Sequence, residues 1–133
     1  MMPARPTITD YMASDLVTLA PDLEINQAMV ILLERRFSGA PVVNAAGELV
    51  GTLSKKDCLR TALHATYHEK PGGFVSDYMS RNVQTLDANV DLFEAAEAFL
   101  QSPFRRFPVL REGRLVGQIS RADLLRALVE QWQ

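Results

Sequence analysis

The chain has 133 residues, enough for one ordinary domain or for two very small halves that share a core. An apolar content of 47% and a charged content of 23% exclude a wholly disordered chain. The formal net charge of -2 argues against nucleic-acid binding, which draws most of its affinity from contacts between cations and phosphates.

No segment of the sequence is predicted to enter a membrane. The first ten residues lack the apolar core of a signal peptide. The longest strongly apolar run, AMVILL at 28–33, is far shorter than the ~20 residues that span a bilayer. A single cysteine allows no internal disulfide and gives no sign of an oxidising compartment. We therefore expect a cytoplasmic protein with neither a nucleic-acid nor a membrane partner.

The sequence contains an internal repeat. Asp-Tyr-Met occurs at 10–12 and again at 77–79, a shift of 67. Identical residues recur at this shift, among them Thr18 and Thr85, and Pro41 and Pro108. The second copy then lacks one residue in a turn, and the shift becomes 66 for Ser54 and Ser120, and for Asp57 and Asp123. So many identities in order, with a single gap, predict two copies of one structural unit.

Repeat 1 is predicted at 7–66. Its first predicted element, after Asp-Tyr-Met, is a short apolar strand at 16–19. A helix follows over 25–33, because its apolar residues recur at helical spacing. Two apolar strands at 40–43 and 49–54 flank a glycine-bearing turn and predict a hairpin. A last helix begins directly after the hairpin.

Repeat 2 is predicted at 74–130, after a linker at 67–73. Its elements follow the same order: a strand at 83–86, a helix at 92–100, hairpin strands at 107–110 and 115–120, and a helix from 121. A unit of this size buries too little surface to be stable alone. The two copies are therefore expected to pack together as one module.

Each repeat has a Ser-x-x-Asp step where its last strand meets its last helix, at Ser54 and Asp57 and again at Ser120 and Asp123. One interpretation is structural. A serine at a helix N-cap accepts a hydrogen bond from the third amide of the helix, and an acid three residues later completes a capping box. The other interpretation is a ligand site.

Several features favour a ligand. Lys55, Lys56 and Arg121 lie in the first turns of these helices, where cations oppose the helix dipole but favour a bound anion. A glycine three residues before each serine, Gly51 or Gly117, weakens its strand unless something approaches the backbone closely.

The two copies differ where the middle strand begins. Repeat 2 has Arg105 and Arg106 there, whereas repeat 1 has Ser38 and Gly39. Cations, a carboxylate and hydroxyl groups at one corner suit a ligand that carries both phosphate and vicinal hydroxyls. The aspartate would repel phosphate, but it can accept both hydroxyls of a ribose.

These motifs resemble those of CBS domains, named from cystathionine beta-synthase. The resemblance lies in the leading Asp-Tyr-Met, in Pro-Val-Val of the middle strand and in the closing Gly-x-apolar-Ser-x-x-Asp, and it covers Thr7 to Leu128. A tandem CBS pair, or Bateman module, implies an α/β (α+β) fold. Two β-α-β-β-α repeats would pack with pseudo-two-fold symmetry.

The resemblance implies a regulatory ligand and no catalysis. CBS pairs commonly bind adenosine compounds in clefts between the copies. We expect AMP, ADP or ATP here, ahead of S-adenosylmethionine or NAD, and no required cofactor. The implied ligand-binding positions are Thr18, Ser38, Gly39, Ala40, Pro41, Ser54, Asp57, Thr85, Arg105, Arg106, Phe107, Pro108, Ser120 and Asp123.

The expected roles follow the motif. Asp57 and Asp123 would bind the ribose, and the serines would lie near the ribose or the phosphate. Arg105 and Arg106 fall where the family often carries phosphate-binding residues, although a solvated strand edge remains an alternative for them. Repeat 1 lacks these cations, so we expect two unequal sites, with the more highly charged nucleotide preferred where the arginines reach.

The resemblance also implies a homodimer formed through helices. Because no enzyme or transporter is attached within this sequence, the expected effector is a separate protein. A second hypothesis keeps the fold without the ligand, and the chain is then an interaction or dimerisation scaffold in which Ser-x-x-Asp acts only as a cap.

Other chemistry finds little support. His64 and His68 share the spacing of a zinc pair but lack a convincing third ligand, so we expect no metal site. Cys58 aligns with Leu124 and is expected in the core rather than as a nucleophile. Neither serine has a neighbouring base, and we expect no enzymatic activity.

Overall fold

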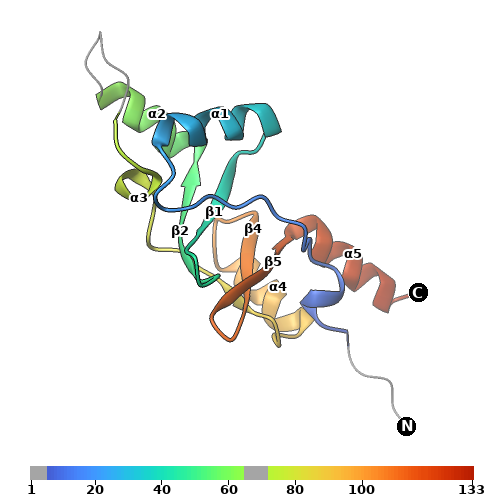
Figure 1. The fold of residues 1–133 in the computed structure, drawn as a ribbon. Helices are drawn as coiled ribbons and strands as arrows, with labels where there is room; N and C mark the ends of the chain where they lie inside the picture. Colours follow the sequence, from blue (N-terminus) through green and yellow to red (C-terminus); the bar gives the residue numbers. More distant parts are fainter. Residues whose placement is uncertain (1–5, 65–71) are drawn as a thin grey trace. The chain divides into compact units, whose positions relative to one another are not determined.

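The computed structural model describes residues 6–64 and 72–133, and the chain forms two compact units (Figure 1). The central unit comprises Val17–Val83. The terminal unit combines the described part of Met1–Leu16 with Gln84–Gln133. Helices and strands occur in both units, so the predicted mixed α+β class is confirmed.

The central unit is built on an antiparallel hairpin of β1 (Gly39–Val43) and β2 (Leu49–Ser54). Helix α1 (Ile25–Arg35) precedes the hairpin, and α2 (Lys55–His64) begins at the residue after β2. Figure 1 shows α1 and α2 next to one another, and the short helix α3 (Val75–Tyr78) contacts both.

The terminal unit has the same plan. Its elements are the 3-10 helix η1 (Ile8–Asp10), β3 (Leu86–Asp87), α4 (Leu92–Leu100), β4 (Arg106–Arg111), β5 (Arg114–Ser120) and α5 (Arg121–Gln131). Strands β4 and β5 are antiparallel, β3 pairs with β4 in parallel, and α4 packs on α5.

The first strand of each repeat is shorter than predicted. At 16–19 only Leu19 pairs, by one parallel bridge to Val42. A turn closed by the hydrogen bond from the Leu23 amide to the Ala20 carbonyl, 3.1 Å long, begins at the next residue and takes the chain away from the hairpin. In repeat 2 the strand is the two-residue β3.

Each unit has its own hydrophobic core. The central core is made of Leu19, Ile25, Ala28, Leu32, Ala40, Val42, Leu53, Cys58, Val75 and Met79. The terminal core is made of Ile8, Leu86, Ala88, Leu92, Ala95, Phe99, Phe107, Val109, Ile119, Leu124 and Ala127. Cys58 is therefore a core residue, as predicted. The predicted His64–His68 pair lies outside the described side chains.

The segments around the two Asp-Tyr-Met motifs, here called lead-ins (7–13 and 74–80), are exchanged between the repeats. The first lead-in pairs with β5 through two backbone hydrogen bonds between Ala13 and Gln118, 2.9 and 2.8 Å long. The second pairs with β2 through two hydrogen bonds between Thr52 and Ser80, both 2.9 Å. Each compact unit therefore contains parts of both repeats, whereas the predicted repeat boundaries follow the duplication in the sequence.

The Asp of each motif shapes its lead-in. Asp10 Oδ2 accepts a hydrogen bond from the Thr7 amide at 3.0 Å, and Asp77 Oδ2 accepts one from the Phe74 amide at 2.8 Å. These bonds close a single helical turn, which brings one apolar side chain, Ile8 or Val75, into the core with no exposed surface. The repeated motif thus anchors a short segment to a distant hairpin.

The Met of each motif explains the strand glycines. A Cβ atom on Gly51 would lie 2.7 Å from both Met79 Sδ and the Ser80 carbonyl oxygen. A Cβ on Gly117 would lie 2.5 Å from Met12 Sδ and 2.8 Å from the Ala13 carbonyl oxygen. The close approach predicted from these glycines is confirmed, but the approaching group is the lead-in and not a ligand.

Within the described part of the chain, no helix combines the length and apolar character needed to cross a lipid bilayer.

Replacement of Gly117 by alanine is expected to lower the free energy of unfolding by about 1–3 kcal/mol, the usual cost of overpacking. The added methyl group meets the Ala13 carbonyl oxygen, and a backbone atom cannot rotate away as a side chain can. Urea denaturation measures the change. Gly72→Ala is the matched control, because nothing lies within 4 Å of a Cβ there. Equal stability of the two variants would refute the role given to Gly117.

Candidate ligand-binding site

The first candidate site is the corner between β2 and α2 in the central unit. The Asp57 amide donates a hydrogen bond to Ser54 Oγ at 3.0 Å, and the Ser54 amide donates to Asp57 Oδ2 at 2.9 Å. This reciprocal pair is a capping box, which satisfies two backbone amides that would otherwise lack partners.

The corner between β5 and α5 in the terminal unit has the same geometry. Ser120 Oγ accepts from the Asp123 amide at 3.1 Å, and Asp123 Oδ2 accepts from the Ser120 amide at 2.9 Å. The structural interpretation of Ser-x-x-Asp is therefore confirmed in both repeats. The proposed contact with a ribose stays a prediction.

An arginine binds the second oxygen of each carboxylate, a contact that the sequence reasoning missed. Arg60 Nη1 lies 3.2 Å from Asp57 Oδ1, and Arg126 Nη2 lies 3.2 Å from Asp123 Oδ1. The arginine side chains are 59% and 54% exposed, whereas the aspartates are 15% and 21% exposed. The sequence does contain the signal, because an arginine follows each aspartate by three residues, which is helical spacing.

The start of the middle strand is tied to each corner by the backbone. The Lys55 amide donates to the Ser38 carbonyl at 2.8 Å, and Gly39 pairs with Ser54. A Cβ on Gly39 would lie 2.9 Å from the Leu53 carbonyl oxygen, so a larger residue does not fit there. The central unit therefore brings together four predicted site residues: Ser38, Gly39, Ser54 and Asp57.

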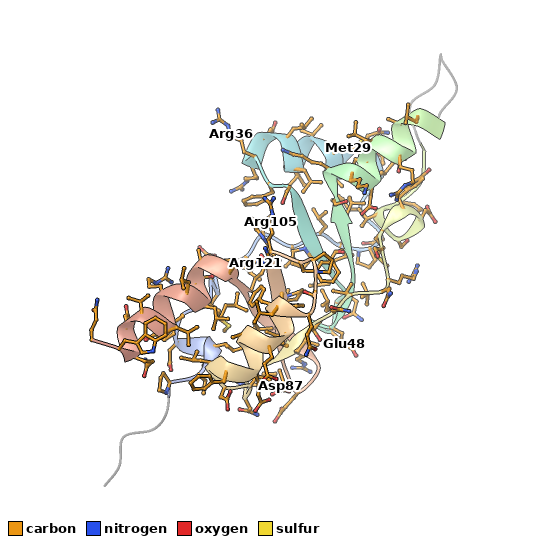
Figure 2. The ribbon with its side chains drawn as sticks, turned by 180° about the vertical axis from the view of Figure 1, so that it is seen from behind. Met29, Arg36, Glu48, Asp87, Arg105 and Arg121 are labelled. Carbon is orange, nitrogen blue, oxygen red and sulfur yellow. The ribbon has the colours of Figure 1, made fainter. Side chains whose placement is uncertain are left out.

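The terminal unit makes the equivalent connection with arginines. The Arg121 amide donates to the Arg105 carbonyl at 3.0 Å, and Arg106 pairs with Ser120. Figure 2 labels Arg105 and Arg121 at this corner. Both side chains and that of Arg106 are exposed, and none of them forms an ion pair with residues 6–64 or 72–133. This corner presents three guanidinium groups at a helix N-terminus.

The remaining predicted residues lie on the middle strands, β1 and β4, or directly before the residues that pair with them. In the central unit, Thr18 is exposed beside Leu19, whose amide donates to the Pro41 carbonyl at 2.9 Å. Pro41 is buried, and the Ala40 side chain is part of the core. Thr18 is thus brought to the edge of β1, where the strand offers mainly backbone groups.

Thr85, Phe107 and Pro108 hold the equivalent places in the terminal unit. Thr85 directly precedes β3, and Pro108 is buried. The Phe107 ring is 2% exposed and packs against Phe99 with ring centroids 4.8 Å apart. Its side chain therefore serves the core, and only its backbone remains for a ligand.

The acid–base properties of the site show no prepared nucleophile among the described residues. Burial, and secondly the charge of Asp57, raise the pKa of the Cys58 thiol. A raised pKa keeps the thiol protonated and unreactive at neutral pH. Within 6–64 and 72–133, no cluster of three or more His, Cys, Asp or Glu residues has metal-binding geometry.

The chain is similar to several proteins along most of its length. It is 29% identical over 125 residues to protein MJ1225 of Methanocaldococcus jannaschii, covering 94% of this chain and 44% of that protein. It is 33% identical over 112 residues to an inosine-5'-monophosphate dehydrogenase of Thermoplasma acidophilum, covering 84% of this chain and 21% of the enzyme. The chain therefore spans less than half the length of either relative.

The fold also matches solved structures. The crystal structure of CBSX2 from Arabidopsis thaliana in complex with AMP superposes with a TM-score of 0.79 and 28% identity, covering 96% of this chain and 98% of that one. The family model of the CBS domain matches twice, at residues 8–64 and 75–130. Two matches that together cover most of the sequence show that this chain belongs to the CBS domain family and carries two CBS repeats in tandem.

Proposed function

We propose that the protein is a regulatory module that binds an adenosine nucleotide at its two strand-to-helix corners. The observation that carries the proposal is the corner of the terminal unit, where a capped carboxylate and three exposed arginines occur together at one helix N-terminus. CBSX2, which is similar over nearly its whole length, binds AMP. The proposed ligand belongs to the AMP, ADP and ATP class.

In this proposal Asp57 and Asp123 bind the ribose hydroxyls. A carboxylate has about four acceptor positions, and the capping amide and the arginine use two of them. Because each arginine partner is more than half exposed, it can turn into solvent at little cost. The cap meanwhile holds the carboxylate in one orientation, which lowers the entropy lost on binding.

The phosphates would lie beside the first turn of the closing helix. There Arg105, Arg106 and Arg121 supply charge in the terminal unit, and Lys56 supplies it in the central unit. The adenine would lie along the middle strands, near Thr18 and the backbone of Ala40 and Pro41, or near the equivalent residues of repeat 2. The two sites would be unequal, with the arginine-bearing corner preferring more phosphates.

This inequality suits energy sensing. AMP, ADP and ATP share the adenosine group and differ in the charge of the phosphate tail, which is the part that the arginines would contact. The module would perform no chemistry and would signal to a separate effector protein, acting as a homodimer. Exposed apolar side chains on the helices, including Leu33 and Leu100 at 66% and 87% exposure, support self-association.

A scaffold without a ligand is the second candidate. Both capping boxes are closed, and both oxygens of each aspartate already have protein partners. Thermal unfolding with AMP, ADP, ATP, NAD and S-adenosylmethionine separates the two functions. A ligand at a hundred times its Kd adds about 2.7 kcal/mol of stability, and the scaffold hypothesis predicts no response to any of the five.

Removal of the negative charge by Asp123→Asn is expected to weaken nucleotide binding by roughly 1.5–3 kcal/mol, the scale of hydrogen bonds to a charged group. The asparagine carbonyl still accepts from the Ser120 amide, so the cap and the fold are kept. Isothermal titration calorimetry measures the loss. Asp91→Asn is the matched control, because Asp91 also caps a helix, α4, with its Oδ1 2.9 Å from the Glu94 amide, but is not a predicted site residue. Its affinity for nucleotide should not change. Full affinity in Asp123→Asn would exclude the ribose contact.

Replacement of Arg106 by alanine is expected to weaken ATP binding by about tenfold and adenosine binding by less than about threefold, because a guanidinium bound to phosphate loses a charge-assisted pair. Competition titrations with both ligands give the ratio. Arg114→Ala removes the same charge at the far end of the hairpin and should change neither affinity. Equal losses for ATP and adenosine would show that Arg106 does not contact phosphate.

A further inference from the structure

One arginine of the terminal unit contacts both the candidate site and a lead-in. Arg126 Nη2 lies 3.2 Å from Asp123 Oδ1 and 3.3 Å from the Tyr11 carbonyl oxygen. Asp123 belongs to repeat 2 and Tyr11 belongs to repeat 1, and both lie in the terminal unit. A single nitrogen atom therefore joins the carboxylate proposed for the ribose to the backbone of the other repeat.

A second contact holds the same lead-in residue on α5. The Tyr11 hydroxyl donates a hydrogen bond to Glu130 Oε2 at 2.7 Å. Glu130 follows Arg126 by four residues, so both side chains lie on one face of the helix. Figure 1 shows η1 of the first lead-in, in blue, beside α5, in red. The two contacts, of the Tyr11 carbonyl with Arg126 and of its hydroxyl with Glu130, are here called the clasp.

The described part of the central unit has no equivalent of the clasp. Among the described residues, Arg60 bonds only to the carboxylate of its own corner. Tyr78 donates its hydroxyl to the Gly72 carbonyl and not to α2. The position that aligns with Glu130 is His64, which offers no carboxylate. The two repeats therefore share the corner but differ in what the corner is connected to.

We infer that Arg126 is a positioning residue that transmits occupancy of the terminal site to the first lead-in. This inference rests on the proposed function. The ribose hydroxyls would donate to Asp123 and take the place of the guanidinium on Oδ1. The remaining contact with the Tyr11 carbonyl, at 3.3 Å, is longer than an ordinary hydrogen bond and comes from a side chain that is 54% exposed. It would not hold the arginine without the carboxylate, so binding opens the clasp.

An open clasp loosens the lead-in without detaching it. Ile8 has no exposed surface in the core, and two backbone hydrogen bonds join Ala13 to Gln118. These two anchors do not involve Arg126 and would stay in place. The change is therefore confined to residues 9–12, where local opening becomes easier once the side-chain contacts with α5 are lost.

The central corner gives no such response in this scheme. Arg60 touches no lead-in among the described residues, so a nucleotide on Asp57 leaves the contacts of residues 74–80 as they are. Of the two candidate sites, the terminal one would then signal between the repeats.

Hydrogen–deuterium exchange of the full chain, followed by mass spectrometry, tests the clasp. Saturation with AMP is expected to speed exchange of the peptide covering 7–13 by about threefold, and not to speed exchange at 74–80. Arg126→Met keeps the apolar stem of the side chain and removes both contacts. Its first lead-in should exchange about threefold faster without AMP and respond no further to it. Arg60→Met is the matched control and should leave both lead-ins unchanged.

Calorimetry with adenosine, which carries no phosphate, tests the competition for the carboxylate. The terminal site is identified as the one that Asp123→Asn weakens. Arg126→Met removes the group that occupies Oδ1 and should lower the Kd of this site by about twofold, the scale of an exposed ion pair. Tyr11→Phe removes only the contact with Glu130, so it should speed exchange at 7–13 with no change in Kd.

The possible results separate this inference from the proposed function. AMP binding that leaves exchange at 7–13 unchanged or slower would overturn the inference alone. An unchanged lead-in in Arg126→Met, with the circular dichroism spectrum of the starting protein, would overturn it as well. A higher Kd for adenosine in Arg126→Met would place the arginine on the ligand and contradict the competition. Absence of any nucleotide binding refutes the proposed function, and the role of Arg126 fails with it.

Discussion

A serine and an aspartate three residues later hold each strand-to-helix corner by exchanging two hydrogen bonds, and every functional argument about this protein depends on that pair. The bonds fix where the closing helix starts and which way the carboxylate points. A carboxylate held in this way needs no reorganisation to accept two vicinal hydroxyl groups. The capping role and the proposed ribose role are therefore compatible, and the first prepares the side chain for the second.

The two corners differ mainly in charge. The middle strand of the central unit begins at Gly39, which passes too close to Leu53 and Ser54 to carry a side chain. The equivalent position in the terminal unit is Arg106, which also pairs with the serine of its corner but carries a cation. A duplicated fold can in this way keep one recognition geometry for the sugar and vary the response to the phosphates.

Features that depend on local sequence were predictable, and those that depend on a distant partner were not. The caps at Ser54 and Ser120 follow from residue spacing alone, and the core position of Cys58 follows from alignment of the repeats. The exchange of the lead-ins does not follow. Strands β2 and β5 both have a glycine three residues before their serine, so the local pattern cannot tell which lead-in packs on which strand.

Dependence on a distant partner also explains why the sequence indicated a ligand near Gly51 and Gly117 when the lead-ins lie there. Their lack of a side chain correctly indicated close approach, but the approaching atoms come from Met79 and Met12, far away in the sequence. The arginines at 60 and 126 are a different case. Their pairing with Asp57 and Asp123 is local, three residues apart on a helix, and follows from the helical period once the closing helices are placed.

The exchange also places each candidate site next to a junction between the repeats. On β5, Gln118 binds the first lead-in, and Ser120, two residues later, forms the corner. On β2, Thr52 binds the second lead-in, and Ser54, again two residues later, forms the corner. Arg126 strengthens the connection, because its Nη2 lies 3.2 Å from Asp123 Oδ1 and 3.3 Å from the Tyr11 carbonyl oxygen of the lead-in. A ligand that takes the place of this arginine on Asp123 would also release its contact with the lead-in of the other repeat. Coupling of this kind is limited to the difference in affinity between the two arrangements, typically 1–3 kcal/mol, which is enough for a regulatory response.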